Sequence, residues 1–266
     1  AMKIRITTWN VNSVRLRADR LAQLVETARP DVLCLQETKV TDDLFPVDAF
    51  AELGFTHHVI RGQKSYNGVA ILSRLPFAET GGDIWCGRED CRHISARLEA
   101  GPEIHNFYVP AGGDIPDREQ NEKFGHKLDF IAEMTAWSDR RKTDGVPKVL
   151  VGDLNIAPLE ADVWSHKQLL KIVSHTPVET EGLNGVMAAG DWVDAIRHIH
   201  GPDEKLFSWW SYRSPNWQTN DRGRRLDHVW VTPDLSPALS EASILRDARS
   251  WEKPSDHVPV TVQLDL

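Results

Sequence analysis

The clearest pattern in the chain is a set of apolar, strand-like runs that meet polar or acidic residues at their tips. Five segments share it: residues 4–10, 32–37, 149–155, 226–232 and 255–260. Runs of this kind usually become the buried interior of a sheet. A carboxylate in such a place is costly unless a positive group meets it. If the fold gathers these tips, their mutual repulsion requires a divalent cation, so the pattern predicts a metal-dependent hydrolase.

Helical spacing and further strands fill the stretches between these runs. We expect helices over residues 13–29, 119–141 and 158–171, and strands over residues 67–73 and 103–109. The order of strands and helices is mixed, which indicates an α/β layered fold rather than a run of regular βαβ units. Because candidate ligands come from both halves of the chain, we expect one domain over residues 1–266.

The composition is that of an ordinary globular protein and excludes few functions. Of the 266 residues, 41% are hydrophobic and 26% are charged, which is enough for a substantial core. The formal net charge of −8 argues weakly against a nucleic-acid partner, but a local basic patch can still serve one. Three cysteines form neither a disulfide framework nor a zinc pattern. With no apolar signal segment or membrane span in the sequence, we expect a cytoplasmic protein.

Two strand tips are the first candidates for chemistry. Asp153 and Asn155 lie two residues apart, so on an extended chain they point the same way and could hold a water and a metal oxygen together. Glu37 follows a four-residue apolar run, and ligand sites gather at the carboxyl ends of strands in α/β sheets. Taken alone, the first pair also fits a capped strand-end turn, and Glu37 also fits a helix N-cap or a surface salt bridge.

A histidine near the end of the chain needs a partner. Asp256 and His257 are neighbours, and neighbouring side chains on a strand face opposite ways. Asp227 is a candidate to orient His257, because a buried carboxylate behind an imidazole raises its pKa and fixes its tautomer. His228 then points away and is structural. Tyr108 ends another strand, where it either contacts a phosphate or packs as a strand-end aromatic.

Residues 207–225 are rich in aromatic and arginine side chains, in contrast to the acidic average of the chain. Arginines hold phosphates, and aromatic rings stack on bases or wedge between them. We expect Trp209 to be buried and Trp210 to be exposed. The candidate DNA contacts are Arg88, Trp209, Trp210, Arg213, Trp217, Arg222 and Arg224.

In this order, the segments resemble the exonuclease III family of apurinic/apyrimidinic endonucleases, within the endonuclease/exonuclease/phosphatase superfamily. The matching pieces are Trp9-Asn-Val-Asn12, Leu35-Gln-Glu-Thr-Lys39, Asn67-Gly-Val-Ala-Ile-Leu-Ser73, Tyr108-Val-Pro110, Gly152-Asp-Leu-Asn-Ile-Ala-Pro158, Phe207-Ser-Trp-Trp210, Arg225-Leu-Asp227 and Ser255-Asp-His257. The resemblance implies a four-layered α/β sandwich, in which two packed mixed β-sheets are flanked by helices. The site would lie at the top of the sheets.

The resemblance also implies roles for the strand tips. The implied metal-binding residues are Asn10, Glu37, Asp153, Asn155, Asp256 and His257, with Glu37 as the main ligand of Mg²⁺ and Mn²⁺ as a substitute. The implied catalytic residues are Tyr108, Asp153, Asn155, Asp227 and His257. In this scheme Asp153 activates or orients the attacking water, and Asp227 orients His257 toward the phosphate.

The implied activity is Mg²⁺-dependent hydrolysis of the phosphodiester 5′ to abasic sites in duplex DNA. Further 3′→5′ exonuclease and 3′-phosphatase or phosphodiesterase activities would share the site. We expect a monomer with no membrane and no obligate protein partner, in a bacterial-type cytoplasm and associated with the nucleoid through DNA. An abasic nucleotide is cheap to extrude, and Phe207, Trp209 and Leu226 are the expected walls of a small apolar pocket for it.

Three features depart from the family pattern, and two other functions stay open. Ala111 stands where an amide is usual, Ser211 stands where an aspartate is usual, and residues 112–117 differ. A phosphomonoesterase or lipid phosphodiesterase could use the same scaffold, although the loop of tryptophans and arginines suits a duplex better. An RNA-binding regulator without catalysis would have lost ligands that are all present here. The sequence leaves open the balance of the three nuclease activities, the number of metals and whether RNA is a substrate.

Overall fold

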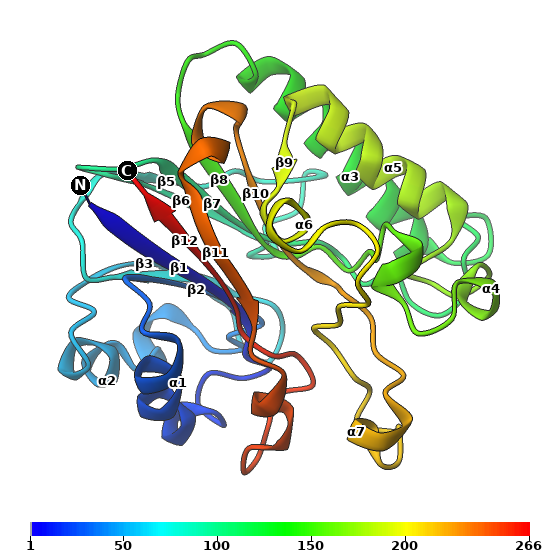
Figure 1. Cartoon of the computed structure of the whole chain (residues 1–266), viewed down its shortest axis with the longest axis horizontal. Coiled ribbons are helices and arrows are strands. Elements are labelled where there is room, and N and C mark those ends of the chain that lie inside the picture. Colours follow the sequence, from blue (N-terminus) through cyan, green and yellow to red (C-terminus); the bar gives the residue numbers. More distant parts are fainter. Residues whose placement is uncertain (1) are drawn as a thin grey trace.

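Residues 2–266, which the computed structural model describes, build two six-stranded β-sheets that pack on each other (Figure 1). The first sheet contains β1 (Lys3–Asn10), β2 (Val32–Gln36), β3 (His57–Arg61), β4 (Val69–Ser73), β11 (Leu239–Ile244) and β12 (Val260–Asp265). The second contains β5 (Phe77–Gly81), β6 (His93–Leu98), β7 (Glu103–Tyr108), β8 (Lys148–Asp153), β9 (Val193–Asp194) and β10 (Asp227–Val231). The strand orders are β11-β12-β1-β2-β4-β3 and β5-β6-β7-β8-β10-β9.

Both sheets are mixed, and their facing sides form a common core. β1 is parallel to β2 and antiparallel to β12, while β8 is parallel to β7 and antiparallel to β10. Val32 of the first sheet and Val149 of the second belong to one buried cluster. The alternate residues Leu33 and Leu35 point the other way and pack with a helix. A strand that is covered on both faces is apolar at every position, which explains the continuous apolar runs in the sequence.

Helices cover the outer face of each sheet (Figure 1). The first sheet carries α1 (Leu21–Ala28) and α2 (Val47–Glu52), and the second carries α3 (Glu122–Arg141) and α5 (Pro177–Gly190). Shorter helices are α4 (His166–Leu169), α6 (Ala195–His200) and α7 (Trp217–Asn220). The 3₁₀ helices are η1 (Ala18–Arg20), η2 (Asp42–Leu44), η3 (Glu160–Asp162), η4 (Pro233–Ala238) and η5 (Arg246–Ser250). The predicted sandwich of two mixed sheets between helical layers is confirmed.

Of the three helix predictions, one is confirmed, one is confirmed in part and one is wrong. The prediction for residues 119–141 is confirmed by α3, whose start is capped by the Asn121 side chain. The helix expected over residues 13–29 is confirmed only in its second half, by α1 from Leu21 to Ala28, and Ser13 at its expected start has a positive φ of 81°. The single helix expected over residues 158–171 is wrong, since this range holds only the 3₁₀ helix η3 and the four-residue helix α4. The long helix α5 lies where no helix was predicted, and its internal Gly182 and Gly185 weaken the helical signal.

The topology brings the polar strand tips to one edge of the sheets. The parallel pairs end there, with Asn10 closing β1 and Asp153 closing β8. β10 runs antiparallel to β8, so it begins at this edge with Asp227 paired to Asp153. β12 runs antiparallel to β1 and begins only at Val260. His257 therefore lies in the loop before β12, and the prediction of a strand over residues 255–260 is wrong.

Two further observations concern the chain as a whole. None of the helices in residues 2–266 combines the length and the apolar character needed to span a membrane. The three cysteines are free thiols, and Cys34 is a fully buried core residue.

Candidate active site

Three side chains meet at the edge of the sheets. Glu37, Asp153 and His257 each place one ligand atom within 4.8 Å of the others. Asn10 lies beneath them, because its side-chain amide donates to Glu37 Oε2 and, over 2.8 Å, to Asp153 Oδ2. Glu37 follows β2 with a φ of +52°, so the chain turns at this residue instead of continuing the strand. The fold thus brings together residues that are separated by up to 247 positions in the sequence.

The negative charge of this cluster is not balanced by the protein alone. The pKa of Asp153 is raised to about 7, mainly by burial and also by the Asp227 and Glu37 carboxylates, while His257 and Asn10 oppose the increase. Such an increase reports an anionic site that needs a positive charge. Carboxylate and amide oxygens are ligands that suit a hard divalent cation. The residues present therefore fit a metal ion between Glu37 and Asp153.

Asp256 lies beside this cluster. Its Oδ2 accepts a hydrogen bond of 3.0 Å from Trp209 Nε1, while its Oδ1 is buried without a hydrogen-bond partner among residues 2–266. It lines the same cavity as Glu37 and Asp153. A buried carboxylate oxygen without a partner is costly, and a metal ion or its bound water would satisfy it.

His257 is held by a carboxylate on its far side. Its Nδ1 donates to Asp227 Oδ2 over 2.7 Å, and its Nε2 lies 3.4 Å from Asp153 Oδ2. Burial alone would lower the pKa of His257, but the carboxylates of Asp227 and Asp153 outweigh it and hold the pKa well above its usual value. The imidazole is therefore a cation at neutral pH, with Nε2–H on the side of the carboxylates. The pairing of Asp227 with His257 is the one that the sequence predicted.

Ser208 fixes the position of Asp227 and was not foreseen as a site residue. Its hydroxyl donates to Asp227 Oδ2 over 2.7 Å and accepts from the backbone N–H groups of Leu226 and Asp227. The side chain is fully buried. Ser208 lies within the Phe207-Ser-Trp-Trp match, but only the aromatic residues of that match were predicted to belong to the site.

His228 takes the structural role expected of it. Its Nε2 donates to Ile156 O over 2.8 Å, and the ring is fully buried behind Asp227. Burial and the charge of Arg225 lower the pKa of His228 to about 4. It is therefore a neutral core histidine and no ligand of the site.

Tyr108 ends β7 at the cavity, and its hydroxyl stays protonated. Burial and the nearby Glu37 carboxylate raise the pKa of Tyr108 well above its usual value. The Arg92 guanidinium lies over the ring, 5.0 Å from its centroid, and donates to Tyr108 O over 3.2 Å. A buried, neutral phenol at this place can donate a hydrogen bond to a phosphate oxygen.

Asn155 reaches the site by a different route from the one expected. The strand stops at Asp153, and Asn155 adopts a left-handed backbone with a φ of 53°. Its backbone N–H donates to Asp153 Oδ1 over 3.0 Å, and its side chain donates to Val109 O over 2.7 Å. The premise of an extended chain through Asn155 is therefore wrong. A tight turn, stabilised by Asp153 itself, presents Asn155 to the cavity.

A buried lysine ties the loops of the site together. Lys127 of α3 is fully buried and donates to Ala111 O over 3.1 Å, to Asn155 O over 2.8 Å and to a Glu179 carboxylate oxygen. Glu179 also accepts from the backbone of Ser174 over 2.9 Å. Burial lowers the pKa of Lys127, while the Glu179 carboxylate raises it. Lys127 was not predicted from the sequence to be a site residue, although it lies three residues after Phe124 on the apolar face of its helix.

The cluster opens into a cavity of about 360 Å³. Of the three expected apolar walls, Trp209 and Leu226 line this cavity. The assignment of Phe207 as a wall is wrong, because its ring packs with Trp210 in a separate buried cluster. Arg224, which was expected only as a DNA contact, lines the cavity as well.

The expected exposures of the tryptophan pair are reversed. Trp210 is only 1% exposed, and its Nε1 donates to Asp221 Oδ1 over 2.9 Å. Trp209 is partly exposed and pairs through its backbone with Arg224 and His257 at the cavity. Neighbouring residues on an extended chain face opposite ways, so the pairing of Trp209 turns Trp210 inward. A buried Trp210 neither contacts DNA nor wedges into a duplex, and its assignment as a DNA contact is wrong.

The remaining candidate contacts lie around the cavity. Trp217 opens α7, is partly exposed and packs its ring 5.0 Å from Trp210. Arg213 and Arg222 are exposed, and Arg222 lies over the Trp164 ring at 4.8 Å from its centroid. Their exposure is compatible with a role in contacting a phosphate backbone.

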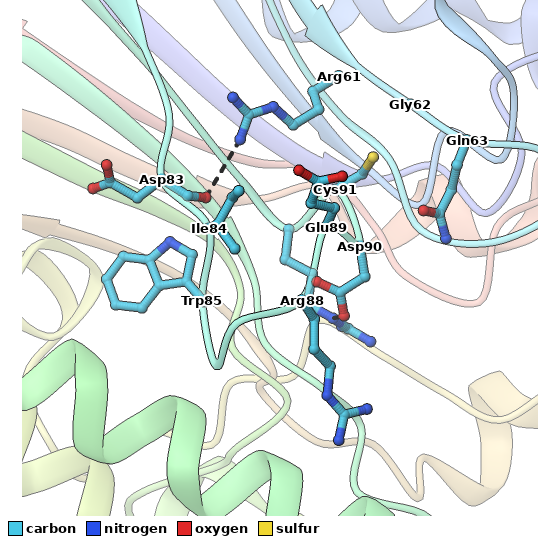
Figure 2. A pocket seen from close by; sticks show the side chains of 11 residues that line it. Arg61, Gly62, Gln63, Asp83, Ile84, Trp85, Arg88, Glu89, Asp90 and Cys91 are labelled. Atoms are coloured by element: carbon cyan, nitrogen blue, oxygen red, sulfur yellow. Dashed lines mark hydrogen bonds and ion pairs between the residues drawn. The ribbon is translucent and has the colours of Figure 1, made fainter.

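Arg88 lies apart from the carboxylate cluster. It borders a second cavity of about 400 Å³. In this cavity the Arg61 guanidinium donates to Asp83 O over 3.3 Å, whereas the Arg88 guanidinium points away from that contact (Figure 2). Arg88 also borders a groove that is lined by Gly113 and Asp114, and both of these residues line the cavity of the carboxylate cluster as well. Arg88 therefore lies on a groove that adjoins the cavity of the carboxylate cluster.

Comparisons with known proteins agree with this geometry. Residues 7–257 match the sequence model of the Endonuclease/Exonuclease/phosphatase family. Exodeoxyribonuclease III of Haemophilus influenzae is 31% identical over 268 residues, covering 97% of this chain and 98% of that protein. An AP endonuclease structure from Archaeoglobus fulgidus superposes with a TM-score of 0.91 at 32% identity, covering 99% of this chain and 100% of that one. The 3′ phosphatase NExo from Neisseria, bound to a product DNA hairpin, gives 0.90 at 33% identity with the same coverage.

Proposed function

Because the chain belongs to the endonuclease/exonuclease/phosphatase family, we propose that it is a metal-dependent DNA repair nuclease. It hydrolyses the phosphodiester on the 5′ side of abasic sites in duplex DNA and also trims 3′ ends, as a 3′→5′ exonuclease and a 3′-phosphatase or phosphodiesterase. The relatives named exodeoxyribonuclease III, AP endonuclease and 3′ phosphatase support these three activities. The observation that carries the proposal is the cluster of Glu37, Asp153 and His257, with Asp227 behind the histidine.

Glu37, Asp153, Asn10 and Asp256 would hold the metal, for which we propose Mg²⁺ with Mn²⁺ as a substitute. The bound ion supplies positive charge that neutralises the scissile phosphate. Asp153, whose pKa is raised to about 7, orients the attacking water and accepts a proton from it. Asn155 is fixed beside it by the Val109 carbonyl and positions the same water or the phosphate.

Beside the carboxylates, two hydrogen-bond donors face the phosphate. The imidazolium of His257 donates from Nε2 to a phosphate oxygen, while Asp227 keeps its ring in place. Tyr108 donates its phenolic proton to the phosphate region. Donors that are fixed before the reaction stabilise the charge that develops in the transition state. Hydrolysis leaves a 3′ hydroxyl.

The partner that we propose is duplex DNA with abasic sites or 3′ ends. Arg88, Trp209, Arg213, Trp217, Arg222 and Arg224 are the residues that we assign to it. We further propose that residues 1–266 act as one domain and as a monomer without an obligate protein partner. The cytoplasmic location expected from the sequence stays a prediction.

A single gel experiment tests the metal and the three activities. A labelled duplex with one abasic analogue, an intact blunt duplex and a duplex with a 3′-phosphoryl end are incubated with Mg²⁺, with Mn²⁺ and with EDTA. We expect cleavage of all three with Mg²⁺ and none after chelation, because the metal ion supplies the positive charge that neutralises the scissile phosphate. Activity that survives in metal-free buffer would contradict the metal assignment. Equal competition by inositol phosphates would favour a phosphatase of small headgroups instead.

Asp153→Ala tests the role assigned to the Asp153 carboxylate. We expect this variant to lose cleavage of the abasic duplex while its binding to the same duplex, measured by gel shift, stays close to that of the wild type. The reason is that Asp153 acts on the water and the metal, whereas duplex affinity comes mainly from contacts with phosphates outside the cavity. Cleavage at the wild-type rate would remove Asp153 from the mechanism.

A further inference from the structure

Arg224 is rigidly placed at the wall of the catalytic cavity. Its backbone pairs with Trp209 in both directions, each hydrogen bond being 3.0 Å long. Its side chain lines the cavity together with Asp153 and His257. The guanidinium lies over the Trp209 ring, 5.0 Å from its centroid. Stacking of this kind restricts the guanidinium to one plane, in which its edge forms the hydrogen bonds.

The contacts of this guanidinium are all with neutral groups. Its Nη1 donates to Val173 O over 3.1 Å and to Ser174 Oγ over 2.9 Å, and its Nε is buried without a partner. Among residues 2–266, no carboxylate oxygen lies within the 4.0 Å of an ion pair from it. Glu179 is the one carboxylate that raises the pKa of Arg224, and it is already bound by Lys127.

The next residue in the chain shows what a compensated arginine looks like in this fold. Arg225 is fully buried, and its guanidinium binds the carboxylates of Asp162 and Asp194 at 2.6 and 2.8 Å. Arg224 has no such partner, although it is partly buried and its Nε is fully buried. A charge that is removed from water without a counter-ion is costly, so it is expected where a ligand brings the opposite charge.

We infer that Arg224 is a specificity-determining residue that binds the additional charged oxygen of a 3′-terminal phosphomonoester. This inference rests on the proposed function, because it takes the scissile phosphate to lie at Asp153 and His257. In a phosphodiester one of the three non-leaving oxygens carries a sugar, whereas in a phosphomonoester the same oxygen carries a second charge and no sugar. The apolar side chains Val173 and Leu226 suit a sugar in this cavity, but a guanidinium in the same space suits an oxygen anion.

The chemistry that Arg224 favours is the hydrolysis of a 3′-phosphate. The oxygen of water forms a bond to phosphorus, the bond between phosphorus and the 3′ oxygen breaks, and the 3′ oxygen takes up a proton. The products are inorganic phosphate and a 3′ hydroxyl. Arg224 touches neither the attacking water nor the leaving oxygen in this scheme. It binds the group that distinguishes the monoester from the diester.

The test compares two substrates of identical sequence in the full-length protein with Mg²⁺. One is a duplex with a recessed 3′-phosphoryl end, and the other carries an internal abasic analogue. For Arg224→Leu we expect kcat/KM on the 3′-phosphoryl end to fall by about 10- to 100-fold, and by a clearly smaller factor on the abasic duplex. Arg224→Lys keeps the charge and should recover part of the loss. Arg97→Leu is the matched control, because Arg97 lies on β6 and pairs only loosely with Glu79 at 3.7 Å.

Inorganic phosphate provides a second readout that does not need 3′-phosphatase turnover. It is added as an inhibitor of abasic cleavage, and we expect about tenfold weaker inhibition of Arg224→Leu than of wild type and Arg97→Leu. Thermal unfolding identifies a variant that fails to fold, in which case Arg224→Gln replaces it. An equal loss on both substrates, or unchanged inhibition by phosphate, would overturn the inference.

The wild-type enzyme separates this inference from the proposed function. Cleavage of the abasic duplex without hydrolysis of the 3′-phosphate would overturn the inference and leave the abasic endonuclease activity standing. Hydrolysis of the 3′-phosphate that depends on Arg224, without abasic cleavage, would support the inference and remove that endonuclease activity.

Discussion

At the scale of single residues, the site depends on buried charges that hold one another in place. Lys127 is the clearest case, because its ammonium group joins the loop at Ala111, the turn at Asn155 and the carboxylate of Glu179. Removing one partner of a buried ion pair leaves an uncompensated charge, which destabilises a protein by about 3–5 kcal/mol. The same change would also release the turn that carries Asn155.

We therefore predict that Lys127→Met lowers both the free energy of unfolding, by about 3–5 kcal/mol, and kcat on the abasic duplex. The double variant Lys127→Met, Glu179→Gln removes both charges and should be less destabilised than the single variant. Its kcat should stay low, because Ala111 O and Asn155 O still lack their donor. Urea unfolding and steady-state kinetics measure the two quantities. A double variant with wild-type kcat would show that Lys127 does not position the site.

At the scale of secondary-structure elements, the pairing of β7 with β8 sets the position of Asp153. Gly152 has a φ of 143°, and a Cβ added to it would lie 1.9 Å from Phe107 O on the neighbouring strand. Only glycine permits this close approach of the two backbones. The residue after it is the carboxylate of the site, so any shift in the pairing moves Asp153.

Gly152→Ala should lower the free energy of unfolding by about 1–3 kcal/mol, as expected for a side chain forced into a packed interior. It should also reduce kcat, because the clash is relieved by moving the end of β8. Gly185→Ala in α5 is the control, since a Cβ there meets nothing within 4 Å. That variant should gain about 0.5–1 kcal/mol from helix propensity and keep its activity. Denaturant unfolding measures the free energy of unfolding of both variants. Equal values for the two variants would contradict the prediction.

At the scale of the whole molecule, the interior holds several histidines in their neutral form. Burial lowers the pKa of His93, His105, His175 and His228. For His228 the pKa falls from 6.5 to about 4, because its Nδ1 is buried without an acceptor and Arg225 lies nearby. The unfolded chain binds a proton at this residue between pH 6.5 and pH 4, and the folded chain does not. Stability contributed by the neutral histidine is present above pH 6.5 and is lost as the pH falls through that window.

The free energy of unfolding should therefore decrease between pH 7 and pH 4.5, with up to about 3 kcal/mol of the loss due to His228. In His228→Gln the amide can still donate to Ile156 O but does not titrate. The free energy of unfolding of this variant should therefore decrease less with falling pH, by the part that is due to His228. Urea unfolding at the two pH values measures the difference. The same decrease in the variant and in the wild type would exclude His228 as its source.

The strands and the chemical type of the site could be predicted from the sequence because both leave local signals. Apolar runs that end in Asn10, Glu37 or Asp153 mark buried strands with polar ends, and the fold confirms their positions. The long helix α3 is confirmed for the same reason, since an apolar face repeats along it. Residues 158–171 misled the prediction because their conformation is held by distant partners. Asp162, for example, binds Arg225 and Arg197.

The sequence by itself thus determined which residues could carry the chemistry: carboxylates at strand ends, a histidine with an acidic partner and a segment rich in aromatic and arginine residues. Only the tertiary structure decided which side chains of that segment face the cavity. Trp209 and Arg224 line it, while Trp210 is buried behind them. Periodicity reports the face of a regular strand or helix, but in an irregular loop the face is set by contacts with residues far away in the chain. For this reason the carboxylate cluster was visible in the sequence, and the uncompensated arginine beside it was not.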